Sequence, residues 1–241
     1  MSSATRTSFY RELGAALFSS ARYATFSAFF ALSAAFLSAA LQIGEGKFWT
    51  LQALWTLSVA FPLPILVSLV TMPLFAGERA AGTYESLTLL PIPLRKIVVG
   101  KFTASFLSVC VALAGSTVPW FLLRHALGSR APETALLYAP LTLLLLHAFS
   151  WTALGTLCSA LAKRPWVAAT GTLFAGGALM FAWAAFSRFF LDGNWQSTPF
   201  PIWSELLDAS SGRIAVHSFV FHASFGLWCL FACVQTLEAR R

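Results

Sequence analysis

The chain has 241 residues, of which 58% are hydrophobic and only 10% are charged, and its mean hydropathy is +0.73. A soluble domain carries roughly 25% charged residues. The composition therefore excludes a water-exposed globular fold and predicts an all-α, polytopic membrane protein, folded as one domain over residues 1–241. The net charge of +7 could also suit a nucleic-acid partner. Because the basic residues lie beside apolar segments rather than in one patch, we expect no such partner.

The first 23 residues are polar and mildly basic, and they lack the apolar core and cleavage site of a secretory signal peptide. Phe9, Leu13 and Leu17 recur every four residues, with charged residues between them. This spacing predicts a short amphipathic helix over residues 1–23 that lies on the membrane surface in contact with lipid. A disordered tail is the alternative.

Six stretches are long and apolar enough to cross a bilayer, which needs about 20 residues. They cover residues 24–43, 54–75, 102–123, 135–161, 167–190 and 214–237. Of the 16 Lys and Arg residues, eleven lie at one set of ends and five at the other, and this asymmetry predicts that both termini are cytoplasmic. The segment 191–213 then lies outside the cytoplasm, where it either caps the outer mouth of a pathway or forms a plain loop.

The predicted spans are nearly free of charge, because Arg188, at the outer end of the fifth, is their one ionisable Asp, Glu, Lys or Arg. Ion-driven transporters need ionisable groups at membrane depth, so we expect any energy for transport to come from outside the chain. No G-x-x-x-x-G-K-S/T nucleotide motif occurs, since Gly100-Lys101 is followed by Phe102. We therefore expect no enzymatic activity and no cofactor in this chain.

A few polar residues within the apolar stretches suggest a metal or haem site as an alternative. His147, His217 and His222 are candidates, and His222 shares one helix face with Cys229 and Cys233. There is neither a CxxC pair nor an apparent fourth ligand or carboxylate support. Packing, with hydrogen-bonded histidines, is the favoured interpretation, and no metal is expected.

The densest run of charge and special backbone residues is the cytoplasmic loop 77–101 between the second and third spans. Gly82 can adopt positive φ and end the helix that descends from the membrane. Thr83 can then cap a short second helix, and Glu85 in its first turn complements the helix dipole. Pro91 and Pro93 stop that helix. The loop therefore predicts a short surface helix suited to docking on a cytoplasmic partner.

This loop resembles the signature of ABC-2 type transporter permeases. The resemblance rests on two runs, Glu78-Arg79-x-x-Gly82-Thr83-x-Glu85-x-Leu87-x-x-x-Pro91 and Ile97-Val98-x-Gly100-Lys101-Phe102. The C-terminal run Leu237-Glu238-Ala239-Arg240-Arg241 is similar to the branch that includes gliding-motility-associated and copper-site-maturation permeases. Pro73 and His217 depart from residues common in the family, which leaves the subfamily open.

The resemblance implies a permease of the bacterial inner membrane that pairs with a separate ABC ATPase and with a second permease copy or paralogue. ATP and Mg²⁺ would bind on the ATPase, whose hydrolysis would drive export or translocation. The loop would dock on it as a coupling helix, with Gly82 as the hinge. The implied ATPase-coupling residues are Glu78, Arg79, Gly82, Thr83, Glu85, Leu87 and Pro91.

Two other functions stay open. One is a membrane scaffold that transmits ATPase-driven movement to a periplasmic protein through the segment 191–213. The other is an intramembrane enzyme or haem-handling protein built on the three histidines. Fold-level resemblance does not decide between them.

Overall fold

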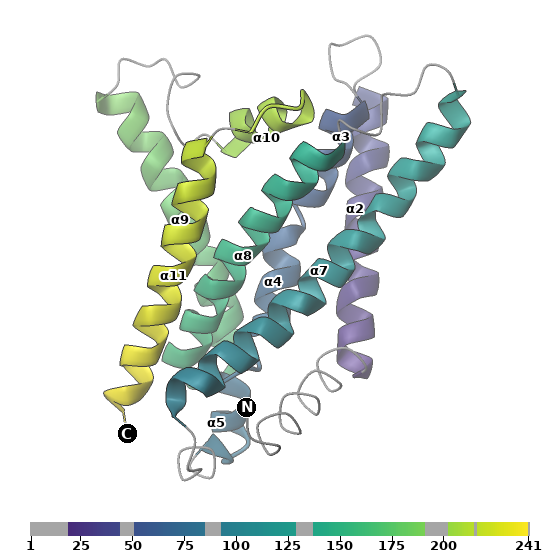
Figure 1. Cartoon of the computed structure of the whole chain (residues 1–241). Coiled ribbons are helices and arrows are strands. Elements are labelled where there is room, and N and C mark those ends of the chain that lie inside the picture. The colour runs from purple at the N-terminus through teal and green to yellow at the C-terminus, as the bar shows by residue number, and fades with distance from the viewer. Residues whose placement is uncertain are drawn as a thin grey trace.

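The computed structural model describes residues 19–43, 51–84, 93–128, 137–190, 202–214 and 216–240, and in these ranges all regular structure is helical (Figure 1). The all-α prediction is thereby confirmed. The helices are α2 (Ser20–Ile43), α3 (Leu51–Ala60), α4 (Leu63–Thr71), α5 (Ala76–Ala80), α7 (Leu94–Leu127), α8 (Tyr138–Leu161), α9 (Pro165–Phe190), α10 (Ile202–Ser210) and α11 (Val216–Glu238).

Five helical stretches are long and apolar enough to cross a membrane, so the chain is a multi-pass membrane protein. They are Ser20–Gln42, Gln52–Thr71, Leu94–Ala126, Tyr138–Leu161 and Val216–Glu238. The predicted fifth span, 167–190, falls within α9, and its crossing of the bilayer stays a prediction. Residues 1–18, which hold most of the predicted surface helix, lie outside the described residues.

The second span differs from the prediction, which drew it as one segment over residues 54–75. It starts at Leu51 and consists of α3 and α4, separated at Phe61 and Pro62. Proline has no N–H to donate, and its ring clashes with the preceding turn, so Pro62 ends one helix and starts the next. The span then ends at Thr71, and the predicted residues 72–75 form a turn that contains Pro73.

The third span also differs, because α7 starts at Leu94 instead of residue 102. Pro93 has extended backbone (φ −62°, ψ 134°) and precedes the first helical residue. The last eight residues of the predicted cytoplasmic loop, 94–101, thus belong to α7. With 34 residues, α7 is about 51 Å long. It exceeds the roughly 30 Å of a bilayer core, and Figure 1 shows that it runs obliquely across the bundle.

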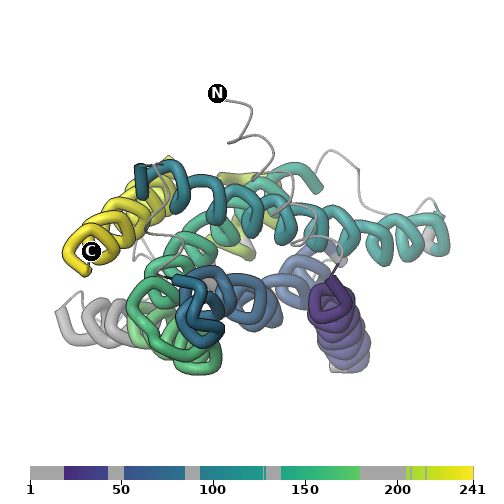
Figure 2. Tube along the Cα trace, turned by 90° about the horizontal axis from the view of Figure 1, so that it is seen from below, coloured from purple at the N-terminus to yellow at the C-terminus, as the bar shows by residue number. Residues whose placement is uncertain are grey.

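The helix α8 lies at the centre of the bundle and packs against α3, α4, α7, α9, α10 and α11. Small residues permit these close approaches. A Cβ at Gly155 would collide with Thr71 of α4, and a Cβ at Gly226 of α11 would collide with Phe149 of α8. The helix α2 stands at the edge of the bundle (Figure 2), and it packs against α3, α4 and α7.

The two ends of the bundle differ. At one end, α5 lies below α4 and close to the last turn of α8 (Figure 1). At the other end, α10 covers α3 and α8, burying Leu206 and Ala209. Within the predicted segment 191–213, α10 is the described helix, whereas residues 191–201 lie outside the described residues.

Candidate coupling site at the α5 end of the bundle

A tight turn closes α5. Gly82 has φ +72°, as predicted from its place in the loop. The Thr83 amide donates to the Glu78 carbonyl (2.9 Å), and the Gly82 amide donates to the Arg79 carbonyl (3.2 Å). This pair of bonds is a Schellman motif, which satisfies carbonyls that a helix end leaves unpaired. The positive φ of Gly82 and these two backbone hydrogen bonds therefore fix the direction in which the chain leaves α5.

One buried hydroxyl of α8 ties the turn before α5 to the bundle. Ser159 Oγ accepts hydrogen bonds from the amides of Phe75 (3.0 Å) and Ala76 (3.2 Å). It donates to the Met72 carbonyl at 3.1 Å. Ser159 is completely buried. Three backbone groups of the α4–α5 turn thus depend on a single side chain 83 to 87 positions away.

Arg79 ties α5 itself to the end of α8. Its Nη1 donates to the carbonyls of Ala160 (2.6 Å) and Ala162 (2.8 Å). A cation is favourable there, because the last carbonyls of a helix carry partial negative charge. The guanidinium also lies 4.6 Å from the ring centroid of Tyr84. Arg240, which follows α11, donates to the Ala160 carbonyl as well, at 3.2 Å.

Glu78 ties α5 to α7 by a partly buried ion pair with Lys101. The distance from Nζ to Oε1 is 2.7 Å, and the side chains are 8% exposed for Lys101 and 25% exposed for Glu78. A buried cation is costly unless it is paired, and the Glu78 carboxylate compensates for that cost. The Lys101 Nζ also lies 5.5 Å from the ring centroid of Phe75.

We call these tethers of α5 the latch; it consists of Glu78, Arg79, Lys101 and Ser159. Of the residues predicted for ATPase coupling, Glu78, Arg79, Gly82 and Thr83 come together here, and the Thr83 hydroxyl donates to the Glu78 carbonyl at 3.3 Å. Glu85, Leu87 and Pro91 lie outside the described residues.

Sequence reasoning did not find Lys101 or Ser159 as part of the site. A basic residue at the start of a span, where the dipole opposes it, was the available signal for Lys101. A serine within an apolar helix gives no comparable signal, because such residues are common packing residues.

Two of the three candidate histidines are buried between α8 and α11. His147 Nε2 accepts a hydrogen bond from Trp151 Nε1 at 2.8 Å, so this nitrogen carries no proton. His222 Nδ1 lies 2.9 Å from Ser150 Oγ. The centroids of the two rings are 5.4 Å apart. The bond between Ser150 and His222 joins α8 to α11, whereas Trp151 and His147 both belong to α8, and this is the packing role that the sequence favoured.

The other candidate ligands lie apart from this pair. His217 lies 3.7 Å from the Glu205 carboxylate, between the start of α11 and α10. Cys229 and Cys233 are buried, and Cys233 faces the Thr156 carbonyl of α8. Among the residues that the structure describes, no three His, Cys, Asp or Glu side chains are grouped so as to hold a metal ion.

Long apolar helices around a central α8 define a multi-pass membrane protein, with the latch at one end of its bundle. A family model described as ABC-2 family transporter protein matches residues 11–199. Because this match spans well over half of the chain, the protein belongs to the ABC-2 transporter family. It is a permease subunit of an ABC transporter, and the family implies an ABC ATPase as its partner. No match was found among curated proteins or among solved structures.

Proposed function

We propose that this chain couples ATP hydrolysis by a separate ABC ATPase to export or translocation across the bacterial inner membrane. ATP and Mg²⁺ bind on the ATPase, and the segment 77–101 is the part of the permease that receives its movement. A second permease, either identical or paralogous, completes a complex with two ATPase subunits. The C-terminal resemblance favours the gliding-motility-associated and copper-site-maturation branch of the family.

The observation that carries this proposal is the latch. A short helix attached only through its chain connections would move under a force from the ATPase without moving the spans. Here Glu78 joins α5 to α7, while Arg79 and Ser159 join α5 and its turn to α8. A displacement of α5 therefore moves the ends of two spans together.

The contacts of the latch suggest two different roles for the predicted coupling residues, transmission of movement and contact with the ATPase. Glu78 and Arg79 are already engaged inside the chain. We propose that they transmit movement and that Glu85, Leu87 and Pro91 make the contact with the ATPase. Gly82 sets the direction in which that contact segment leaves α5.

We place the α5 end in the cytoplasm, with both chain termini on that side. The excess of Lys and Arg is found on the cytoplasmic side of membrane proteins. Arg79, Lys101 and Arg240 gather at the α5 end, whereas Arg124 lies in the last turn of α7, at the opposite end.

Co-purification in mild detergent, followed by an ATPase assay, tests the proposal. We expect an ABC ATPase to accompany the wild-type chain and Glu85→Lys to abolish either its binding or its stimulation. Glu238→Lys is the matched control, since it makes the same charge reversal at an exposed residue of the same end and loses only a surface ion pair with Arg95, which contributes little. Equal ATPase binding and stimulation by the wild-type chain and Glu85→Lys would refute the assignment of the contact segment.

The scaffold remains the second candidate function, and one feature favours it. The helix α10 lies across the end of the bundle opposite the latch, where a periplasmic protein would have access to it. Capture of a periplasmic protein that is lost on deleting residues 191–201, together with ATP-dependent release and no transported substrate, would support the scaffold over the transporter.

A further inference from the structure

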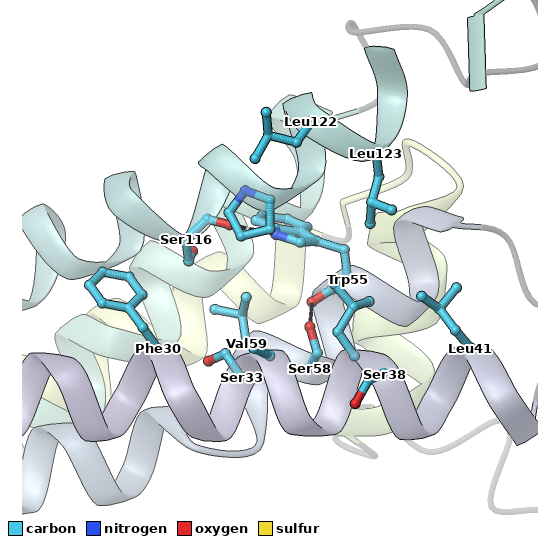
Figure 3. A pocket seen from close by; sticks show the side chains of 13 residues that line it. Phe30, Ser33, Ser38, Leu41, Trp55, Ser58, Val59, Ser116, Leu122 and Leu123 are labelled. Carbon is cyan, nitrogen blue, oxygen red and sulfur yellow. Dashed lines mark hydrogen bonds between the residues drawn. The ribbon is translucent and has the colours of Figure 1, made fainter. Parts of the chain in front are cut away.

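A groove opens between α2, α3 and α7 (Figure 3). The parts of these helices that line it lie in the half of the bundle nearer α10, as the course of the helices in Figure 1 shows. Its volume is about 320 Å³. Carbon surfaces dominate it, among them Phe30 and Leu37 of α2, Val59 of α3 and Leu122 of α7. The ring of Trp55 forms part of the wall and turns its Nε1 away to the Ser116 carbonyl at 2.8 Å.

Most hydroxyls along the groove already have a hydrogen-bond partner within the chain and do not need a polar ligand. Ser38, Ser58 and Ser116 each donate to a carbonyl of their own helix, at 2.7 to 2.9 Å. Ser33 differs, since it is 8% exposed and its Oγ has no hydrogen-bond partner within the described residues. The groove therefore presents hydrocarbon along nearly all of its length.

The depth of the groove in the bilayer follows from α7. Lys101 and Arg124 are 23 positions apart in this helix, a rise of about 35 Å. Because α7 runs obliquely (Figure 1), this rise covers less than about 35 Å across the bilayer, close to the roughly 30 Å of the hydrocarbon core, so the two cations lie near opposite headgroup layers. The innermost α7 residue of the groove, Ser116, is eight positions from Arg124, or about 12 Å. The groove thus extends through most of one leaflet.

The width of the groove fits a single hydrocarbon chain. On α2 its lining runs from Phe30 to Leu41, about 16 Å along the axis. Dividing the volume by this length gives a mean section of about 20 Å², and because packed carbon atoms lie about 4 Å apart, this section accommodates an extended hydrocarbon chain. If the groove were empty, the side chains that line it would lose van der Waals contacts on their groove-facing side.

A cation stands where the lipid headgroup would be. Arg124 directly follows Leu122 and Leu123, which line the groove, and its guanidinium lies 5.7 Å from the ring centroid of Trp120. Guanidinium groups recognise phosphate oxygens well. We propose that the groove holds one acyl chain of a phospholipid from the leaflet on the α10 side, with the lipid phosphate at Arg124.

Photolabelling in nanodiscs tests this site. The wild-type chain is reconstituted in phosphatidylglycerol that carries a trace of the same lipid with a diazirine in one acyl chain, and labelled residues are mapped by mass spectrometry. We expect labels on Phe30 and Leu122, two exposed residues of the lining. Ala34→Trp fills the groove and should lower the labelling there about tenfold, since losing contact with two methylene groups already has that effect.

Matched variants make the outcome decisive. Ala35→Trp adds the same bulk at an exposed neighbour that does not line the groove, and it should label as the wild type does. Ser33→Ala should label at least as well, whereas a loss there would point to a polar ligand and overturn the proposal. Equal labelling of the groove in Ala34→Trp and Ala35→Trp would mean ordinary surrounding lipid and would also overturn it. If Ala34→Trp does not fold, Leu41→Trp obstructs the same groove from an exposed position.

Discussion

The ion pair between Glu78 and Lys101 offers the sharpest test of the latch. Removing one partner of a buried pair costs about 3–5 kcal/mol, because the other charge stays buried without compensation. Lys101 is only 8% exposed, so Glu78→Gln removes a carboxylate partner from a buried cation of α7. Glu78 is less enclosed, with 25% of its side chain exposed, although its Oε2 is buried. We therefore expect Glu78→Gln to cost about 2–3 kcal/mol and Lys101→Met only about 1 kcal/mol.

Thermal unfolding in detergent, followed by tryptophan fluorescence, measures these costs. For a chain of this size, 2–3 kcal/mol corresponds to a fall of about 5–10 °C in Tm. The double variant Glu78→Gln/Lys101→Met should lose less than the sum of the single losses, with a coupling free energy of about 1 kcal/mol or more. Single losses that add within about 0.5 kcal/mol would show that the pair contributes nothing and that α5 is not held to α7 in this way.

Two further predictions concern helix packing and the α10 end. Gly226→Ala should lower the free energy of unfolding by about 1–3 kcal/mol, since its Cβ would collide with the Phe149 ring. Gly100→Ala has open space around its Cβ and should show no loss of stability. A lower Tm for Gly226→Ala than for Gly100→Ala is the expected result, and equal Tm values would contradict it. Burial raises the pKa of Glu205 above its usual 4.5, and the Ser218 hydroxyl and His217 only partly oppose that rise. A carboxyl with a raised folded-state pKa favours its protonated form, so the wild type should gain stability relative to Glu205→Gln as the pH falls through the raised pKa towards 4.5. A Tm difference between these two proteins that is flat from pH 7 to pH 4.5 would contradict this.

Hydropathy alone located five of the six predicted spans as long apolar helices, because the bilayer imposes a length and composition that a sequence must display. Hydropathy gave wrong boundaries at positions where a proline ends or begins a helix. The interruption at Pro62 is invisible to an average over apolar residues, since the residues on both sides are equally apolar. The early start of α7 at Leu94 was missed for the opposite reason, because Arg95, Lys96 and Lys101 made a helical segment look like a loop.

The candidate site divides in the same way between local and distant determinants. The positive φ of Gly82 was predictable, since a helix end followed by glycine is a local pattern. The partner of Lys101 was not, because Glu78 is 23 positions away and approaches only when α5 folds back against α7. Ser159 is more distant still, and its three hydrogen bonds exist only once α8 lies beside the turn after α4.

The latch and the groove share one structural element, and this suggests how the two ends of the protein communicate. The helix α7 runs without a break from Lys101 in the latch to Leu122 and Leu123 in the groove, with Pro119 accommodated inside it. A tilt of about 5° at its latch end would displace the Arg124 end, about 35 Å away, by about 3 Å. This displacement is comparable to the width of a single acyl chain. Movement imposed on α5 would therefore change the shape of the lipid-facing groove without requiring any charge to cross the membrane.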